Sequence, residues 1–216
     1  MYKKKHFFIT FEGIEGSGKT YQSKKLFNKI KKMGCSAIYT REPGGTRSAE
    51  LIREVILKDY FSKDTSENFN KYTDTLLYLA SRNEHIEKKI RPAIKKNKII
   101  ICDRFTDSTL AYQVYGKKVE KGLVDSVHKY ILGKIKPDIT FILKSNISRA
   151  MKRLNKRKKK NRYDKFPEKF YNKVQKSFLK LAKKNKKKYI IVDNSFDTPK
   201  TEKIIFEKFI KVFNDV

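Results

Sequence analysis

The 216-residue sequence predicts a three-layer α/β/α domain built on a parallel sheet. Short apolar runs rich in β-branched residues alternate with longer segments of helical periodicity, which is the order found in βα units. The runs are almost continuously apolar, as expected of strands that are covered on both faces. Polar or glycine-rich motifs follow the first three runs directly. Because ligands of such sheets bind outside the carboxyl ends of the strands, these motifs mark the candidate site.

Five apolar runs are predicted to be strands, and helices are predicted between them. The strands are His6–Glu12, Ser36–Thr40, Lys98–Asp103, Asp138–Leu143 and Tyr189–Asp193, and the helices include Lys19–Lys32, Ala49–Lys58, Lys71–Lys96 and Phe170–Lys184. No internal repeat is visible, and no Gly/Ser-rich linker divides the chain. A length of 216 residues suits one α/β domain, so we expect a single domain over residues 1–216.

The formal net charge of +30 is extreme and raises the question of a polyanionic partner. The lysines are spread along the chain, with the densest runs at residues 156–160 and 183–188. No aromatic-studded strand of the RNA-binding type and no helix-turn-helix pattern accompanies them. We therefore favour a solvated basic surface and do not expect a nucleic-acid partner. The same charge would still steer an anionic nucleotide towards the protein in a salt-dependent way.

The remaining composition points to an intracellular protein without a structural metal. Cys35 and Cys102 are isolated and flanked by apolar residues, and the three histidines lack metal-ligand spacing. The basic N-terminus is followed by an apolar run too short for a signal peptide. No segment approaches the ~20 apolar residues of a membrane span. We expect a cytoplasmic protein with no membrane association.

The stretch GIEGSGKT, which follows the first predicted strand, matches the Walker A phosphate loop. In such a loop glycines turn backbone N–H groups towards phosphate oxygens, and the following helix points its positive end at the same anion. Lys19 would reach the β- and γ-phosphates of ATP, and the Thr20 hydroxyl would bind Mg²⁺. The dinucleotide fingerprint G-x-G-x-x-G does not fit this glycine spacing. The predicted ATP-binding residues here are Gly13, Ile14, Glu15, Gly16, Ser17, Gly18, Lys19 and Thr20.

Asp103 and Arg104 end the third predicted strand and form a second candidate group. Asp103 stands where a Walker B acid would act on Mg²⁺ through water, although it could also cap the helix that follows. Arg41, Arg53 and Arg82 also fall near the carboxyl edge of the sheet. The rigid fork of arginine suits phosphate and base oxygens, so these positions favour a second, anionic substrate.

These motifs, taken together, resemble those of bacterial thymidylate kinases. FEGIEGSGKT, TREPGGT, LLYLASR and DRFTDSTLAYQ occur in that family's order, followed by a late arginine-rich segment, from Phe7 to about Asp193. The resemblance implies a P-loop nucleoside-monophosphate-kinase fold with a five-stranded parallel sheet and a helical lid. It also implies transfer of the γ-phosphoryl of MgATP to dTMP in dTTP synthesis, and a homodimer formed by helices of the first half.

The same resemblance assigns roles to residues on the acceptor side. Tyr78, where the family often has Phe, would stack on the thymine, and Arg82 would hydrogen-bond a base carbonyl. Arg53 and Arg104 would hold the acceptor phosphate in line for attack. Thr109 would reach the base, and Tyr112 would lie against the sugar where a 2′-hydroxyl would clash. Arg104 is thus expected to be both a substrate ligand and, with Lys19 and Asp103, part of the catalytic group.

The predicted lid covers residues 145–166 and supplies the cations that this phosphate loop lacks at its variable positions. By helical spacing, Arg149, Arg153 and Arg157 would share one face. Arg153 and Arg157 match the catalytic lid arginines of the family best, and Arg162 would contact ATP. The sequence departs from its relatives at Lys144, where an acid is usual, and in NRYD, which replaces the usual DR(I/F)E. These departures leave the contacts between lid and ATP less defined than the phosphate loop.

Glu15 is an unusual residue for a loop that binds anions. A carboxylate that faced ATP would be repelled, so we expect Glu15 to turn towards the acceptor, where the resemblance places it on the 3′-hydroxyl of dTMP. Glu12 ends the first strand, and we expect it to be structural or to lie near the metal.

Other functions of the same fold class remain open at the level of sequence. A GTPase would need a guanine-reading N-K-x-D motif late in the chain, and none is found. Another nucleoside monophosphate kinase or a deoxynucleoside kinase would share most of the motifs. A nucleic-acid-binding P-loop ATPase belongs to a different class and rests only on the charge.

Overall fold

The structure is a computed structural model that describes residues 6–58, 68–157, 161–196 and 198–214. The described part contains one sheet of five strands in the order β2-β3-β1-β4-β5, and every neighbouring pair is parallel. The strands are β1 (Phe7–Glu12), β2 (Ala37–Arg41), β3 (Ile99–Asp103), β4 (Ile139–Lys144) and β5 (Tyr189–Asp193). This confirms the predicted fold class.

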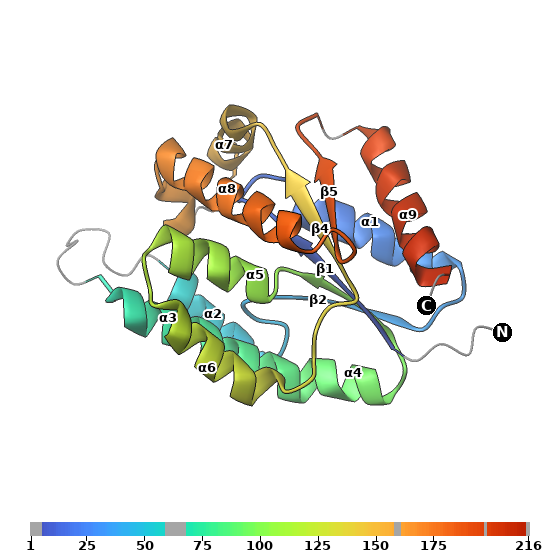
Figure 1. Ribbon diagram of the computed structural model, residues 1–216, viewed down its shortest axis with the longest axis horizontal. Helices are drawn as coiled ribbons and strands as arrows, with labels where there is room; N and C mark the ends of the chain where they lie inside the picture. The colour runs from blue at the N-terminus through green and yellow to red at the C-terminus, as the bar shows by residue number, and fades with distance from the viewer. Residues whose placement is uncertain (1–5, 59–67, 158–160, 197, 215–216) are drawn as a thin grey trace.

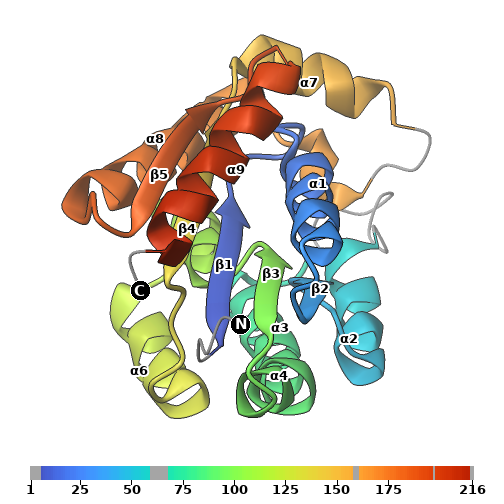
Figure 2. The same ribbon diagram turned by 90° about the vertical axis from the view of Figure 1, so that its right-hand side faces the viewer.

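Helices cover both faces of the sheet (Figures 1 and 2). They are α1 (Lys19–Lys32), α2 (Arg47–Leu57), α3 (Lys71–His85), η1 (Ile86–Ile90), α4 (Arg91–Lys95), α5 (Thr106–Thr109), η2 (Leu110–Gly116), α6 (Lys121–Leu132), α7 (Ile147–Asn155), η3 (Arg162–Lys165), α8 (Glu168–Lys184) and α9 (Pro199–Asn214). Helices α1 and α9 pack on one face through a cluster that includes Leu26, Phe141 and Phe209. The opposite face carries a cluster that includes Ile86 and Ile100. Within the described ranges, no helix combines the length and apolar character that a membrane crossing needs.

The predicted strands were correct in number and order, and their ends differ by about one residue. The second strand runs to Arg41, because Arg41 pairs in register with Asp103 of β3. The fourth begins after Asp138, whose carboxylate accepts a hydrogen bond from the Phe8 N–H of the neighbouring strand β1 at 2.7 Å. The register places the ends of β1, β2 and β3 at one edge of the sheet, as the motifs required.

Three predicted helices differ from the observed ones in internal structure or limits. The segment predicted as one helix from Lys71 to Lys96 is α3, a π-helical turn η1 and the short α4 in succession. The helix predicted from Ala49 begins at Arg47, because the Thr46 hydroxyl accepts a hydrogen bond from the Ala49 N–H and caps it. The predicted helix Phe170–Lys184 begins at Glu168, directly after Pro167.

The predicted lid is only partly helical. Helix α7 ends at Asn155, so the expectation that Arg149, Arg153 and Arg157 share one helical face was wrong for Arg157. Asn161 caps the 3₁₀ turn η3, and its side chain and that of Asp164 form a reciprocal capping box. The lid therefore has the short helix α7 and a separate capped 3₁₀ turn, η3, in place of one longer helix. Residues 158–160 of the lid lie outside the described residues.

Candidate active site

The phosphate loop connects β1 to α1 and has the geometry of an anion site. Gly16 and Gly18 have φ values of 72° and 87°, which favour glycine, and Gly18 is the N-cap of α1 without a side-chain cap. The first N–H groups of the helix are therefore not capped by a side chain and can meet an anion. A Cβ at Gly16 would lie 2.4 Å from the carbonyl oxygen of Ala150 in α7, so this turn also packs against the lid helix.

Lys19 is buried and folds back over its own loop. Its ammonium donates to the Ile14 carbonyl at 2.6 Å and lies 3.5 Å from the Ser17 hydroxyl. Burial, and then the charge of Arg104, lowers the pKa of Lys19 to about 7. A phosphate bound in this loop would give the Lys19 ammonium a negatively charged partner.

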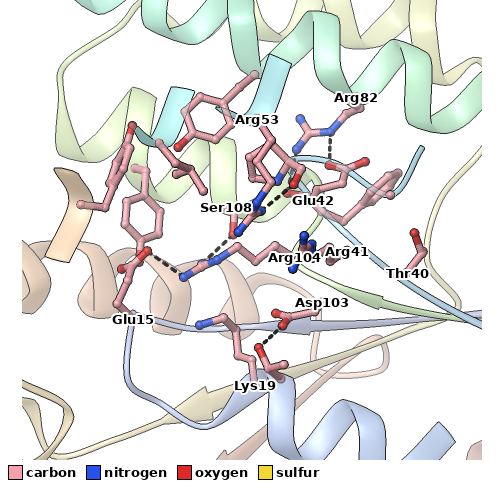
Figure 3. Close-up of a pocket in the computed structure, with 18 of the residues that line it drawn as sticks. Glu15, Lys19, Thr40, Arg41, Glu42, Arg53, Arg82, Asp103, Arg104 and Ser108 are labelled. Carbon is pink, nitrogen blue, oxygen red and sulfur yellow. Dashed lines mark hydrogen bonds and ion pairs between the residues drawn. The ribbon is translucent and has the colours of Figure 1, made fainter. Parts of the chain in front are cut away.

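Asp103, at the end of β3, lies beside Lys19 (Figure 3). Thr20 of α1 lines the same pocket. The Thr20 hydroxyl donates to the Asp103 carboxylate. Mg²⁺ prefers oxygen ligands and keeps several waters, so one hydroxyl and one carboxylate beside the phosphate loop fit it. The described residues contain no cluster of three or more His, Cys, Asp or Glu side chains that could hold a metal by themselves. A Mg²⁺ ion bound here would take its other ligands from water or from the phosphates of a nucleotide.

Arg104 lies at the centre of the pocket and ties three segments together (Figure 3). Its guanidinium donates to the Gly13 carbonyl at 2.9 Å, to the Ser108 hydroxyl at 3.0 Å and to the Glu15 carboxylate at 2.9 Å. Tyr112 donates its hydroxyl to the other Glu15 oxygen. Glu15 thus turns towards Arg104 and Tyr112, two residues expected on the acceptor side.

A buried acid supports the turn that carries Arg104 and Ser108. Glu12 accepts from the Phe105 N–H at 2.7 Å and from the Ser108 hydroxyl at 2.6 Å. Burial, and then the nearby Asp107 carboxylate, raises the pKa of Glu12 to about 8. These contacts of Glu12 are with the turn after β3, and Glu12 is not among the residues that line the pocket, so we interpret Glu12 as a structural acid.

The far end of the pocket is built around Arg82 of α3, which is 2% exposed (Figure 3). Its Nε donates to Glu42 at 2.7 Å, and the other carboxylate oxygen of Glu42 lies 2.9 Å from Nδ1 of His85. Although burial works against the charge, Arg82 and His85 together lower the pKa of Glu42. Thr109 accepts from Arg82 at 2.8 Å. A buried ion pair therefore fixes this arginine.

Aromatic and basic side chains complete the walls. The Tyr78 ring meets the Tyr163 ring edge to face, with centroids 6.1 Å apart. Arg53 donates to the Pro43 carbonyl at 2.6 Å and faces the same cavity. The pocket has a volume of about 390 Å³ and runs from Lys19 and Asp103 to Arg82 and Glu42. A cavity with a phosphate loop at one end and a buried arginine with aromatic walls at the other suits two substrates.

Three of the four arginines in the predicted lid were assigned to catalysis or ATP binding, and they are placed differently. Arg153 lies outside the pocket and donates to the carbonyls of Gly16 and Ser195, both at 2.9 Å. Arg157 lines the pocket and pairs with Asp164 at 3.0 Å. Arg162 lies outside the pocket walls, donates to the Ile56 carbonyl and pairs with Asp74. The structure thus brings Arg157 to the cavity, Arg153 to the phosphate loop and Arg162 to α3.

The cavity brings together most of the residues singled out in the sequence. Those on its wall are Glu15, Lys19, Thr20, Arg53, Tyr78, Arg82, Asp103, Arg104, Thr109, Tyr112 and Arg157. Gly13, Ile14, Gly16, Ser17 and Gly18 form the phosphate loop beside it without lining it. Sequence reasoning missed Glu42, Ser108 and Tyr163. Glu42 follows β2 at the same edge of the sheet as Asp103, so its position could have marked it as a candidate. Ser108 and Tyr163 reach the pocket only through tertiary packing, which the sequence pattern does not show.

Comparison with known proteins identifies the family. The family model described as thymidylate kinase matches residues 11–205. The chain belongs to the thymidylate kinase family. It is therefore a nucleoside monophosphate kinase, a phosphotransferase, and this favours the kinase interpretation over the nucleic-acid-binding ATPase that the charge had left open.

Individual family members match between 81% and 97% of this chain. The thymidylate kinase of Wolbachia pipientis wMel is 46% identical over 81% of this chain and 84% of its own length. That of Mycoplasma capricolum is 40% identical, over 93% and 95% of the two chains. The crystal structure of thymidylate kinase from Ehrlichia chaffeensis superposes with a TM-score of 0.74 and 31% identity, over 97% and 100% of the two chains.

Proposed function

We propose that this member of the family transfers the γ-phosphoryl group of ATP to the phosphate of dTMP and releases dTDP and ADP. The observation that carries the proposal is the single cavity that joins the phosphate loop to the Arg82 end (Figure 3). An oxygen of the acceptor phosphate attacks the γ-phosphorus, and the bond from that phosphorus to the β,γ-bridging oxygen breaks.

The donor is bound by the phosphate loop. The N–H groups at the start of α1 and the Lys19 ammonium are free to meet the β- and γ-phosphates once Lys19 leaves the Ile14 carbonyl. Thr20 and Asp103 would hold Mg²⁺, which supplies charge neutralisation on the transferred phosphoryl group when it is bound. We assign Ile14, Ser17 and the loop glycines to ATP binding through their backbone.

The acceptor is bound by the other half of the cavity. Tyr78 offers a ring face to the base, and Arg82 with Thr109 offers donors to its carbonyl. Arg53 and Arg104 hold the acceptor phosphate in line with the γ-phosphoryl group. Glu15 accepts from the 3′-hydroxyl, and Tyr112 closes the space beside the sugar. Because Glu15 also accepts a hydrogen bond from Arg104, the residue that binds the sugar and the residue that binds the acceptor phosphate are directly linked.

The lid arginines supply cations during the transfer. Arg153 donates to the Gly16 carbonyl of the phosphate loop, and Arg157 lines the cavity next to that loop. We assign catalysis to these two with Lys19, Arg104 and Asp103. Arg162 would reach ATP only after leaving Asp74, and its assignment rests on the family resemblance.

A panel of acceptors tests the proposed reaction. ADP release is measured with ATP, Mg²⁺ and, in turn, dTMP, dUMP, dCMP, dGMP, the ribose form of TMP, and thymidine. We expect dTMP to give the highest kcat/KM, with the ribose form reduced by the clash at Tyr112. A better acceptor than dTMP would refute the substrate assignment, and turnover stimulated by DNA or RNA without an acceptor would support an ATPase instead.

A homodimer in the cytoplasm completes the proposal. Leu51 and Val55 of α2 and Leu76 of α3 are 65%, 37% and 48% exposed, which leaves apolar side chains of these helices open in the single chain. Light scattering coupled to size exclusion should give twice the 25.5 kDa mass of the chain. A monomer at micromolar concentration would contradict this part of the proposal alone.

A further inference from the structure

Arg82 has almost all of its hydrogen-bond donors committed to the protein. A guanidinium carries five N–H groups: one on Nε and two on each Nη. Nε donates to Glu42, one Nη2 N–H donates to the Phe105 carbonyl at 2.9 Å, and Nη1 meets Thr109 and His128. Within the described residues, one N–H on Nη2 is left over. The side chain that faces the base end of the pocket therefore offers a single donor.

His128 is the least expected of these partners. It lies on α6, which contributes no described residue to the pocket wall, and it is 9% exposed. Its Nε2 is 2.6 Å from Nη1 of Arg82. Because a guanidinium cannot accept a hydrogen bond, Nε2 must carry the lone pair and the ring proton must sit on Nδ1. Burial, and then the charge of Arg82, lowers the pKa of His128 to about 3, so the ring is neutral at physiological pH.

The four contacts hold the guanidinium from three separate parts of the chain. Glu42 follows β2, Phe105 and Thr109 belong to the segment after β3, and His128 comes from α6. Without His128, Nη1 would keep one buried N–H with no acceptor. That N–H would draw in water or turn the fork, and either response would change which donor faces the cavity.

We propose that His128 is a positioning residue that aims the one remaining N–H of Arg82 at the base and so sets discrimination between a 4-carbonyl and a 4-amino pyrimidine. The inference rests on the proposed function, in which Arg82 binds the base carbonyl. A thymine presents an acceptor to this N–H, whereas a cytosine presents an amino donor at the same place. His128 itself does not touch the substrate.

The test compares His128→Leu with His128→Gln, which restores an acceptor, and with Tyr130→Ser on the same helix. Tyr130 is 85% exposed and serves as the matched control for changes in α6. For each protein, KM and kcat are measured with dTMP and dCMP, and KM is measured for ATP. Loss of a hydrogen bond to a charged group corresponds to about a tenfold effect or more.

For His128→Leu we expect the dTMP KM to rise about tenfold with kcat within about twofold. The ratio of kcat/KM for dTMP over dCMP should narrow about fivefold or more, while the ATP KM stays unchanged. His128→Gln should recover most of both effects, and Tyr130→Ser should show neither. A change in stability alone would lower the apparent kcat for dTMP and dCMP alike and leave the ratio of their kcat/KM values unchanged. An unchanged ratio in His128→Leu therefore overturns the inference.

A measurement on the unmodified protein covers the case in which His128→Leu does not fold. Long-range ¹H–¹⁵N correlation spectra report the tautomer of each histidine ring, and His128→Gln assigns the signal. A neutral ring with an unprotonated Nε2 at pH 7 supports the inference, and a protonated Nε2 overturns it. If the unmodified enzyme does not phosphorylate dTMP, the proposed function fails instead, which the acceptor panel shows separately.

Discussion

The stability of Glu12→Gln relative to the wild-type protein should increase when the pH is raised from 6 to 8. Glu12 is fully buried, and Oε2 accepts from the Ser108 hydroxyl at 2.6 Å while Oε1 accepts from the Phe105 N–H at 2.7 Å. Burial and the Asp107 carboxylate together outweigh these donors and raise the pKa of Glu12 from 4.5 to about 8. Glutamine keeps the shape and the carbonyl acceptor, and its amide imitates the protonated acid.

The sign follows from the proton that the folded state retains. Between pH 4.5 and about 8 the folded carboxyl is protonated while the unfolded one is ionised. The stabilisation from this proton is complete below the unfolded pKa and is lost as the pH rises through the folded pKa. From pH 6 to pH 8 the wild-type protein should lose about 2 kcal/mol of unfolding free energy relative to Glu12→Gln, which does not titrate.

Urea unfolding of the two proteins at pH 6, 7 and 8 measures this difference. For an m value of about 2.5 kcal/mol per molar, the midpoint of Glu12→Gln should gain about 0.8 M on the wild type between pH 6 and pH 8. Titrating groups that do not interact with Glu12 are common to both proteins and cancel in the difference. Midpoints that move in parallel over this range, or a gap that closes with rising pH, would show that Glu12 is ionised in the folded state.

Three further substitutions test the site and its support. Lys19→Met should lower kcat by about 10³-fold, measured by ADP release, and near-normal turnover would contradict the phosphate-loop assignment. Arg153→Ala should lower kcat at least tenfold with the dTMP KM within about twofold, and an effect confined to KM would exclude a role for this arginine in the transfer. Asp74→Asn removes a fully buried partner of Lys117 (2.7 Å) and should cost about 2–3 kcal/mol, or roughly 4–12 °C in Tm by calorimetry. The exposed Asp125→Asn is its control and should cost less than about 1 kcal/mol.

The sequence was sufficient for the sheet because the strand pattern is local and redundant. The apolar runs of the central strands β1, β3 and β4 are buried almost throughout, while the edge strands β2 and β5 are only partly buried. Gly18, Lys19 and Thr20 could be placed between a strand and a helix from spacing alone. The same argument placed Asp103 and Arg104 at the sheet edge, where the structure has them.

The contacts of the lid could not be predicted in this way. The expectation for Arg157 assumed a helix that continues, but α7 ends at Asn155 and a capped 3₁₀ turn follows. The partners of Arg162 and Arg82 include residues from distant segments, such as Asp74 for Arg162 and His128 for Arg82. Spacing on one element says nothing about which acid or imidazole a distant element brings to it.

The close contact between Gly16 and Ala150 limits which sequences this enzyme can explore. Position 16 is usually understood as a place where a phosphate must approach the backbone. Here even a methyl group would meet the lid helix first, 2.4 Å from a carbonyl oxygen that has no rotamer with which to yield. In a library that varies the phosphate loop to change the donor nucleotide, substitutions of Gly16 would therefore clash with helix α7. Such variants would be damaged before their choice of nucleotide could be tested. Position 16 and helix α7 have to be varied together.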